Sequence, residues 1–263
     1  YQLGKETSVL YKDVVMLDTD VLQLHLRREP RFYACIAADR TYWQRGTNTL
    51  WNNYNLPVYA YKGESFGTTM DIVTSNAPQN PGGYWLKKHT QSSINNVNYI
   101  GSMGNDNTAS VIRLAELYLI QAEAWNEYLG KPNDNVYLPL NKVRERAGID
   151  DVVTAWKSYS NQPGKVDTKE GMREIIRQEI NIELAFEGQR YWNLRRWKIA
   201  ELELNAKQYG WNILGESART FYNNFEGPIV IWSKSKFTAP RNYLTPIKAE
   251  EILISSMVQN PGW

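Results

Sequence analysis

The strongest helix signal in this chain is the stretch MREIIRQEINIELAFEGQRYWNLRRW, residues 172–197. Its apolar residues recur with the spacing of one helix face; they are Met172, Ile175, Ile176, Ile180 and Leu184. Either Asp167 or Thr168 is suited to cap the start, with Glu170 placed to close a capping box on Asp167. Gly188 is suited to end the helix, because glycine adopts the left-handed conformation at little cost.

Three carboxylates lie on one face of this predicted helix. Glu179, Glu183 and Glu187 are each four residues apart, so they stack above one another. The arginines expected to offset or pair with this row are Arg173, Arg177, Arg190, Arg195 and Arg196. We interpret the pattern as a partly buried salt-bridge network that holds two helices in register.

Catalytic interpretations of the same carboxylates are less favoured. A glycan hydrolase using Glu179 and Glu183 would need an open cleft between two carboxylates, and neighbours on one helix face do not imply one. A di-iron site would need Glu-x-x-His on two helices. The two histidines, His25 and His89, do not follow a glutamate at that spacing.

Two further motifs are weak. Residues 63–67 match the G-x-S-x-G nucleophile pattern, and Asp71 and His89 follow in hydrolase order. That span is too short for the strands and helices that would assemble a triad. Residues 18–20 and 105–107 are weak calcium candidates, and we interpret both as solvated turns. We therefore predict no catalytic residue, no metal and no cofactor.

Composition is that of a soluble globular protein. The chain has 263 residues, of which 42% are hydrophobic and 22% charged, and its net charge is +2. That charge is too small to favour nucleic acid or an anionic membrane surface, and no stretch is long and apolar enough for a membrane span. Cys35 is the single cysteine, which excludes an internal disulfide, and we expect a buried thiol.

The chain divides into three regions. Residues 1–108 are rich in glycine, asparagine and proline and predict loops with short strands, whereas residues 109–204 predict helices. Residues 205–263 predict a loop-rich tail that packs on the helical core. Expected strands are 32–37, 58–61, 84–86 and 228–232; expected helices are 109–129, 135–147, 190–204 and 249–253.

The first predicted helix, 109–129, carries two adjacent apolar stripes, which predicts burial on two sides. Together with the helix at 135–147 it has the small residues and the turn of a tetratricopeptide hairpin. Trp125, Trp192 and Trp197 lie on predicted helices and are expected in the core. The predicted fold class is mainly α, with tetratricopeptide-like hairpins, a loop-rich elaboration and a few short strands.

These segments resemble a known family. The segments that carry the resemblance are REPRFYACIAADRTYW (28–43), IRLAELYLIQAEA (112–124), LNKVRERAGI (140–149), EINIELAFEGQRYWNLRRW (179–197) and the ending from YLTPIKAEEI to QNPGW (243–263). In this order they resemble the SusD/RagB-type nutrient-binding lipoproteins of Gram-negative outer membranes. Departures from the usual pattern occur at Glu29, Cys35, Asn193 and Lys248, and none of them touches a known chemical role.

The resemblance implies a non-enzymatic binding protein on the outer face of the outer membrane. Such proteins bind oligosaccharides, or in some members peptides or glycopeptides, and act as a lid on a SusC-type TonB-dependent transporter. The chain resembles the C-terminal half of such a protein, so the lipid anchor is expected in a precursor, outside this chain. A helical scaffold that binds another protein is a further alternative.

Loop aromatics are the candidate binding residues. Glycan binding needs flat apolar rings for the sugar face and amides for its hydroxyls. The resemblance implies that some ligand aromatics come from loops before the helical region, where residues 42–61 lie. The candidates are Tyr42, Trp51, Asn52, Tyr54 and Tyr59, with Trp51 and Tyr54 foremost. Trp43 belongs to the family-like segment and is expected in the core.

Overall fold

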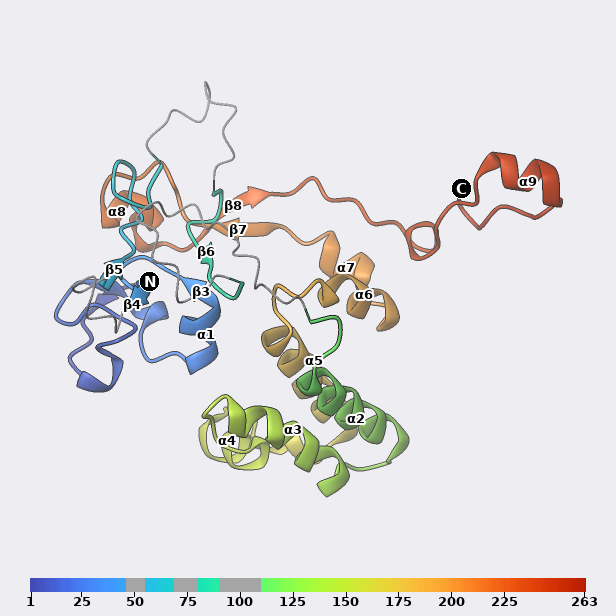
Figure 1. Ribbon diagram of the computed structural model, residues 1–263, viewed down its shortest axis with the longest axis horizontal. Coiled ribbons are helices and arrows are strands. Elements are labelled where there is room, and N and C mark those ends of the chain that lie inside the picture. The colour runs from blue at the N-terminus through green and yellow to red at the C-terminus, as the bar shows by residue number, and fades with distance from the viewer. Residues whose placement is uncertain (46–54, 69–79, 90–109) are drawn as a thin grey trace.

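The protein is represented by a computed structural model that describes residues 1–45, 55–68, 80–89 and 110–263, and these residues are mainly helical (Figure 1). The α-helices are α1 (Pro30–Cys35), α2 (Leu114–Tyr128), α3 (Asp134–Arg146), α4 (Val152–Tyr159), α5 (Lys169–Glu183), α6 (Gln189–Arg196), α7 (Ala200–Leu204), α8 (Ala218–Phe221) and α9 (Ala249–Ser255). The 3-10 turns are Val9–Tyr11, Gln23–His25, Pro163–Asp167, Asn223–Phe225 and Arg241–Tyr243.

The described strands are short and form four antiparallel pairs. The pairs are β1 (Leu3–Gly4) with β2 (Val21–Leu22), β3 (Ile36–Ala37) with β6 (Trp85–Leu86), β4 (Tyr42–Arg45) with β5 (Asn55–Pro57), and β7 (Gln208–Gly210) with β8 (Ile229–Trp232). The strand predictions at 84–86 and 228–232 are confirmed. The prediction at 32–37 is mostly wrong, because Pro30 starts α1 at its first helical position and only residues 36–37 are extended.

Helices α2 and α3 form the predicted hairpin, joined by residues 129–133. The Asn133 side chain caps α3 by accepting a hydrogen bond from the Asn135 backbone N–H at 3.0 Å. Gly148 follows the end of α3 with φ 70°, in the left-handed region. The prediction for residues 135–147 is therefore confirmed to within one residue at each end.

Helix α5 starts at one of the two predicted caps. The Thr168 hydroxyl accepts from the Gly171 N–H at 3.1 Å, so Thr168 is the cap and no box forms between Asp167 and Glu170. The helix ends at Glu183, earlier than predicted, because residues 184–188 form turns. Gly188, at φ 79°, then precedes α6 and redirects the chain.

The predicted helix 190–204 is two helices. Residues 197–199 separate α6 from α7, and Lys198 takes the left-handed conformation at φ 59°. Trp192, in the middle of α6, is 61% exposed, so its prediction as a core residue is wrong. Trp197 is buried, and Trp125 is half-buried against the same core.

The helical core lies among α2, α3, α4, α5 and α6. Its fully buried side chains include Leu119, Val136, Leu140, Met172, Ile176 and Leu194. Both predicted stripes of α2 reach the core: Leu119 and Ala122 are buried, and Tyr118 and Trp125 are half-buried against it. The predicted burial on two sides is only partly confirmed, because residues 111, 112 and 114 at the start of the predicted helix are exposed.

An aromatic core joins the two ends of the chain. Trp211, Phe221 and Tyr222 from the tail pack with Leu22 and Tyr61 from the first region. The rings of Trp211 and Tyr222 meet edge to face at 5.0 Å between centroids. Beside β3, Cys35 is half-buried rather than buried, and burial raises the pKa of its thiol.

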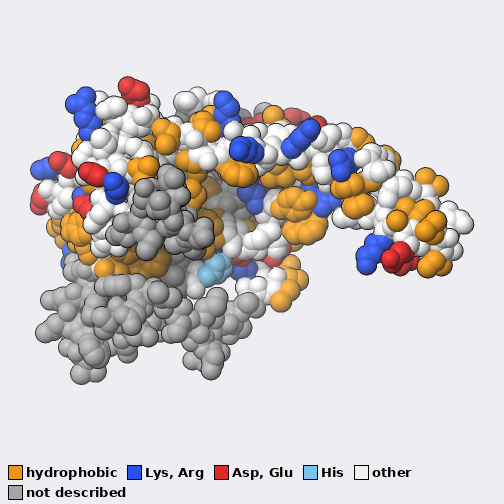
Figure 2. Space-filling view, turned by 90° about the horizontal axis from the view of Figure 1, so that it is seen from above, with side chains coloured by type: hydrophobic (Ala, Val, Ile, Leu, Met, Phe, Trp, Pro, Cys, Tyr) orange, Lys and Arg blue, Asp and Glu red, His pale blue; other side chains and the backbone are white. Residues whose placement is uncertain are grey.

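The C-terminal arm extends away from both cores and carries α9 (Figure 1). Figure 2 shows hydrophobic side chains on this arm, and Leu253, Ile254 and Val258 are among the most exposed apolar residues of the described chain. Within the described residues, no helix has the length and apolar character needed to cross a membrane.

Candidate ligand-binding site

Two of the five predicted binding residues fall within the described structure. Trp51, Asn52 and Tyr54 lie outside the described residues. Tyr42 is in β4, where its carbonyl accepts a hydrogen bond from Lys87 Nζ at 2.9 Å. Tyr59 is half-buried, and the Arg40 guanidinium lies 4.6 Å from its ring centroid. One face of Tyr59 is therefore already stacked against an arginine.

Trp43, expected in the core, is half-buried, with its ring centroid 5.8 Å from that of Phe66. The G-x-S-x-G motif forms a partly exposed turn next to it. Ser65 is exposed, and His89 Nε2 lies 2.9 Å from the Phe186 carbonyl oxygen. This contact does not bring His89 to the serine, and Asp71 lies outside the described residues. Among the described residues no group of histidine, cysteine and acidic side chains is arranged to hold a metal ion.

The carboxylate row of α5 forms the predicted buried ion-pair network. Glu183 lies 2.7 Å from both Arg113 Nη1 and Arg146 Nη2, and 3.1 Å from Arg31 Nη1. Glu179 lies 2.5 Å from Arg31 Nη1, in a contact without hydrogen-bond geometry, and 2.8 Å from Arg144 Nη1. Both carboxylates are almost fully buried. This network ties α5 to α1 and α3.

The partners in this network are not the arginines predicted from the sequence. Arg173 pairs with Glu127, Arg190 with Glu203, and Arg196 with Glu123. Glu187, beyond the end of α5, pairs with Arg113 and Lys88. Arg173, Arg190 and Arg196, which lie near Glu179 in the sequence, thus pair with acidic residues outside the α5 row. The buried carboxylates of α5 pair instead with arginines from other segments of the chain.

This pairing holds Glu183 in its ionised form. Burial raises the pKa of Glu183, but hydrogen bonds from Arg113 and Arg31 outweigh that effect, so its pKa lies below the usual range. A glycosidase acid needs a carboxyl that is protonated near neutral pH and faces its substrate. Glu183 is charged and shared among three arginines, which argues against the hydrolase alternative.

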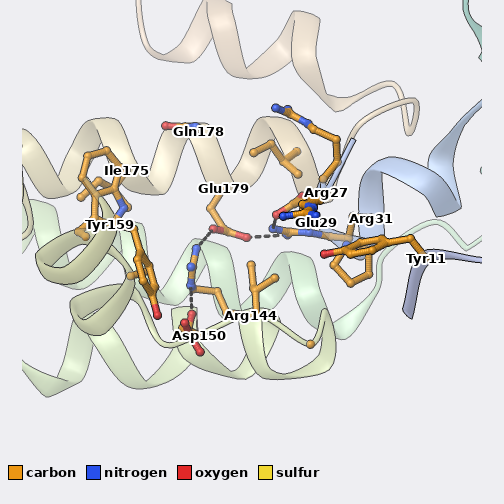
Figure 3. Close-up of a pocket in the computed structure, with 17 residues that line it drawn as sticks. Tyr11, Arg27, Glu29, Arg31, Arg144, Asp150, Tyr159, Ile175, Gln178 and Glu179 are labelled. Carbon is orange, nitrogen blue, oxygen red and sulfur yellow. Dashed lines mark hydrogen bonds and ion pairs between the residues drawn. The ribbon is translucent and has the colours of Figure 1, made fainter. Parts of the chain in front are cut away.

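A pocket of about 550 Å³ opens beside this network, between α1, α3, α4 and α5 (Figure 3). We call it the α5 pocket. Four arginines (27, 28, 31, 144), three acidic residues (29, 150, 179), three aromatic residues (11, 156, 159) and Gln178 are among the residues that line it. Figure 3 shows Glu179 in the middle, with Arg144 and Asp150 on one side and Arg27 and Tyr11 on the other.

The charged groups around Glu179 are already paired with one another. Arg31 binds Glu29 through two nitrogens, at 3.0 and 3.1 Å, in addition to its contacts with α5. Arg144 donates to the Asp150 backbone carbonyl at 2.8 Å as well as to Glu179. These bonds fix the pocket's shape before any ligand arrives, which lowers the entropy cost of binding.

The mouth of the pocket carries the groups available to a ligand. The Tyr159 ring is 76% exposed at the end of α4, and Gln178 is exposed on α5. Arg27 and Arg28 are exposed at the mouth, and Arg27 has φ 51°, which is uncommon outside glycine, asparagine and aspartate. The site thus combines a stackable ring with hydrogen-bond donors and acceptors.

Sequence reasoning did not find this pocket. Residues 28–31 contributed only to the family resemblance, and Arg27 and Tyr159 carried no signal for a binding site. The pocket brings together residues 11, 27–31, 144–159 and 175–182, which are adjacent only in the tertiary structure.

Comparison with known proteins gives one consistent family. The model of the SusD family matches residues 10–263. SusD-like protein P2 of Formosa agariphila is 30% identical over 175 residues, covering 63% of this chain and 29% of that protein. SusD-like protein P25 of the same organism is 42% identical over 89 residues, covering 34% and 15% of the two chains.

Solved structures of SusD-like proteins also resemble this chain. A SusD-like protein of Bacteroides fragilis superposes with a TM-score of 0.63 at 28% identity, covering 92% of this chain and 40% of that one. A SusD-like carbohydrate-binding protein of the same species superposes with a TM-score of 0.55 at 23% identity, covering 88% and 41%. The chain therefore spans less than half the length of these relatives.

Proposed function

The chain belongs to the SusD family, and from that membership we propose that it binds oligosaccharide nutrients without altering them chemically. The supporting observation is the α5 pocket. It offers an exposed aromatic ring and polar side chains at its mouth, while the carboxylate beneath, Glu179, is held in ion pairs. Such an arrangement suits binding and provides no free acid–base pair.

The sugar-binding groups follow from the chemistry of carbohydrates. The C–H face of a pyranose ring stacks on Tyr159 or on the loop aromatics Trp51 and Tyr54, and its hydroxyls bond to side-chain amides and guanidinium groups. Tyr42, Tyr59 and Asn52 complete the candidate set in residues 42–61. We propose these residues and the α5 pocket as two candidate contact surfaces for the glycan.

The place of action follows from the family. We propose that the protein acts on the outer face of the outer membrane, lipid-anchored through its precursor, and passes its ligand to a SusC-type TonB-dependent transporter. The helical body docks on the transporter by a face other than the one that carries the α5 pocket, and both the pocket and the loop-rich region face the ligand. In this proposal regions 1–108 and 109–204 keep their predicted roles, whereas the end of the tail, which carries α9, extends away from the core.

Affinity electrophoresis against a panel of plant and host polysaccharides tests this function. Retardation by at least one polysaccharide is expected, and Trp51→Ala and Tyr54→Ala variants should lose about 2- to 12-fold in affinity, since an aromatic contact contributes roughly 0.5–1.5 kcal/mol. Tyr209→Phe, an exposed tyrosine on β7, is the matched control and should bind like the wild type. Wild-type affinity in both loop variants would refute the residue assignment.

Absence of binding to every polysaccharide would refute the glycan proposal. A peptide and glycopeptide panel then tests the alternative ligand class with the same variants. Release of reducing sugar by the purified chain would contradict the non-enzymatic part of the proposal.

A further inference from the structure

Most charged groups that line the α5 pocket are held in ion pairs. Glu29 and Glu179 are bound to Arg31 and Arg144 within the described structure. Asp150 is the single acidic lining residue for which the described residues provide no ion pair. Arg27 is paired with Glu6, whereas Arg28 has no ion pair with a described residue; we call these two exposed arginines the rim arginines.

The rim arginines are only weakly engaged by the protein. Arg27 Nε lies 3.4 Å from Glu6 Oε2, and the Arg27 side chain is 68% exposed. Arg28 has no ion pair with any described residue, and its guanidinium carbon lies 5.5 Å from the Phe32 ring centroid. The guanidinium of Arg28 therefore keeps its hydrogen-bond donors available to a ligand.

The backbone under Arg28 is fixed, although its side chain is exposed. Its N–H donates to the Tyr33 hydroxyl at 3.2 Å, and that hydroxyl donates to the His25 carbonyl at 2.6 Å. Tyr33 is buried, so this pair of bonds anchors the rim to the core. Arg28 is thus presented from a rigid base, which reduces the entropy lost when it binds.

An arginine presented in this way suits one ligand chemistry. Its planar guanidinium matches a carboxylate or a sulfate with two parallel hydrogen bonds, whereas a neutral hydroxyl takes only one. Tyr159, on the opposite element, offers the ring on which a sugar face can stack. Anion and ring recognition are therefore combined in one pocket.

We infer that the α5 pocket binds acidic saccharides, which carry a carboxylate or sulfate group, and that Arg28 recognises this group. This inference rests on the proposed glycan-binding function and names the class of sugar. Arg27 adds to the positive field, and Asp150 disfavours an acidic group on its own side of the mouth. The acidic group of the sugar is thus oriented toward residues 27–28.

A matched pair of ligands tests the inference with the whole 263-residue chain. Oligogalacturonate and its methyl ester share rings and linkages and differ in the charge of their carboxyl groups. A sulfated galactan oligosaccharide distinguishes sulfate from carboxylate recognition. Calorimetric titration should show at least one acidic probe binding roughly 10-fold more tightly than the ester, as expected for a charge-assisted bidentate contact.

Single-residue variants test which side chain is responsible for the preference for acidic ligands. Arg28→Gln should lower affinity for the preferred acidic probe about 10-fold and leave the ester unchanged, whereas Arg28→Lys should keep part of the preference. Tyr159→Ala should weaken both ligands, because it removes the stacking ring. Arg219→Gln on α8, which does not line the pocket, is the matched control for loss of one exposed arginine. Equal thermal midpoints would show that all four variants fold.

The outcomes are distinguishable. Equal affinity for the ester and both acidic probes, or an unchanged preference in Arg28→Gln, would overturn the inference and leave the glycan-binding function standing. The same loss in Arg219→Gln as in Arg28→Gln would also overturn it, since the effect would then be nonspecific charge. Binding of no glycan at all would refute the proposed function and this inference together.

Discussion

Replacing Glu183 by glutamine should destabilise the fold strongly, because it removes the charge at the centre of the ion-pair network. The Glu183 side chain is 2% exposed and lies within 3.1 Å of Arg31, Arg113 and Arg146. A buried charge is costly unless it is paired, so the arginines left behind carry the penalty. Glutamine keeps the shape of the side chain, so the effect isolates charge from packing.

The magnitude follows from what each arginine retains. Breaking a buried pair costs about 3–5 kcal/mol when the remaining charge has no other partner. Arg31 keeps Glu29 and Glu179, and Arg113 keeps Glu187. Arg146 is more than half exposed and can be rehydrated. We therefore expect a loss near the lower limit, about 3 kcal/mol at pH 7.

Urea denaturation at 25 °C measures this loss as a difference in free energy of unfolding. The control is Glu127→Gln, which removes the partner of Arg173 from a more exposed ion pair 2.5 Å long. Because exposed pairs contribute little, that variant should lose only about 0–1 kcal/mol. A loss below about 1 kcal/mol in Glu183→Gln would refute the reasoning, since the network would then add no more than a surface pair.

Acid titration gives a second check on the same residue. The folded-state pKa of Glu183 is lowered, so its stabilising contribution is complete above the unfolded value of about 4.3 and is lost as pH falls through the folded value. The gap in stability between the wild type and Glu183→Gln should therefore be constant from pH 7 to pH 5 and narrow below about pH 4. A gap that stays constant down to pH 2 would contradict this assignment.

Two further predictions concern the aromatic core and the surface. Burial, together with the charge of Arg28, lowers the pKa of His25 to about 3. The pKa of histidine in the unfolded chain is about 6.5, so the contribution of neutral His25 to stability is complete above pH 6.5. That contribution falls as the pH drops toward 3, and the loss reaches about 2 kcal/mol at pH 5. His25→Gln should flatten the pH dependence between 7 and 5 in urea denaturation, and an unchanged slope would refute the assignment. Trp211→Ala should cost about 3–5 kcal/mol because its ring is 2% exposed, whereas Trp192→Ala, on the surface of α6, should cost less than about 1 kcal/mol. Similar thermal midpoints for these two tryptophan variants would contradict the described burial.

Local patterns predicted the elements whose ends are set by local chemistry. Helix α3 begins at an asparagine cap and ends before a glycine, and α5 has a threonine cap and an apolar face of period 3.6. These signals depend on residues within a few positions of one another, so they are readable without the fold. The presence of a buried network was also predictable, because three stacked carboxylates on an apolar helix require positive partners.

The same local patterns gave wrong predictions of burial where burial depends on packing against a segment that is distant in the sequence. The exposed residues Val111, Ile112 and Leu114 at the start of the predicted first helix, and the exposed ring of Trp192, are as apolar as their buried neighbours. Nothing in the local sequence shows which of these apolar residues another element covers. The two-helix form of 190–204 was missed for a related reason, since Lys198 adopts a left-handed conformation that lysine rarely favours.

The sequence by itself determined that this chain is a largely helical member of one family, with a charged row on α5 that requires partners. Only the tertiary structure decided which residues are those partners. Arg31 is separated from Glu183 by 152 positions, and Arg113 by 70, yet both donate hydrogen bonds to it. Long-range ion pairs leave no periodic trace along the chain, because either partner is an ordinary charged residue until the fold brings the two together. The α5 pocket arises in the same way, from segments that meet only after α1 packs against α3 and α5.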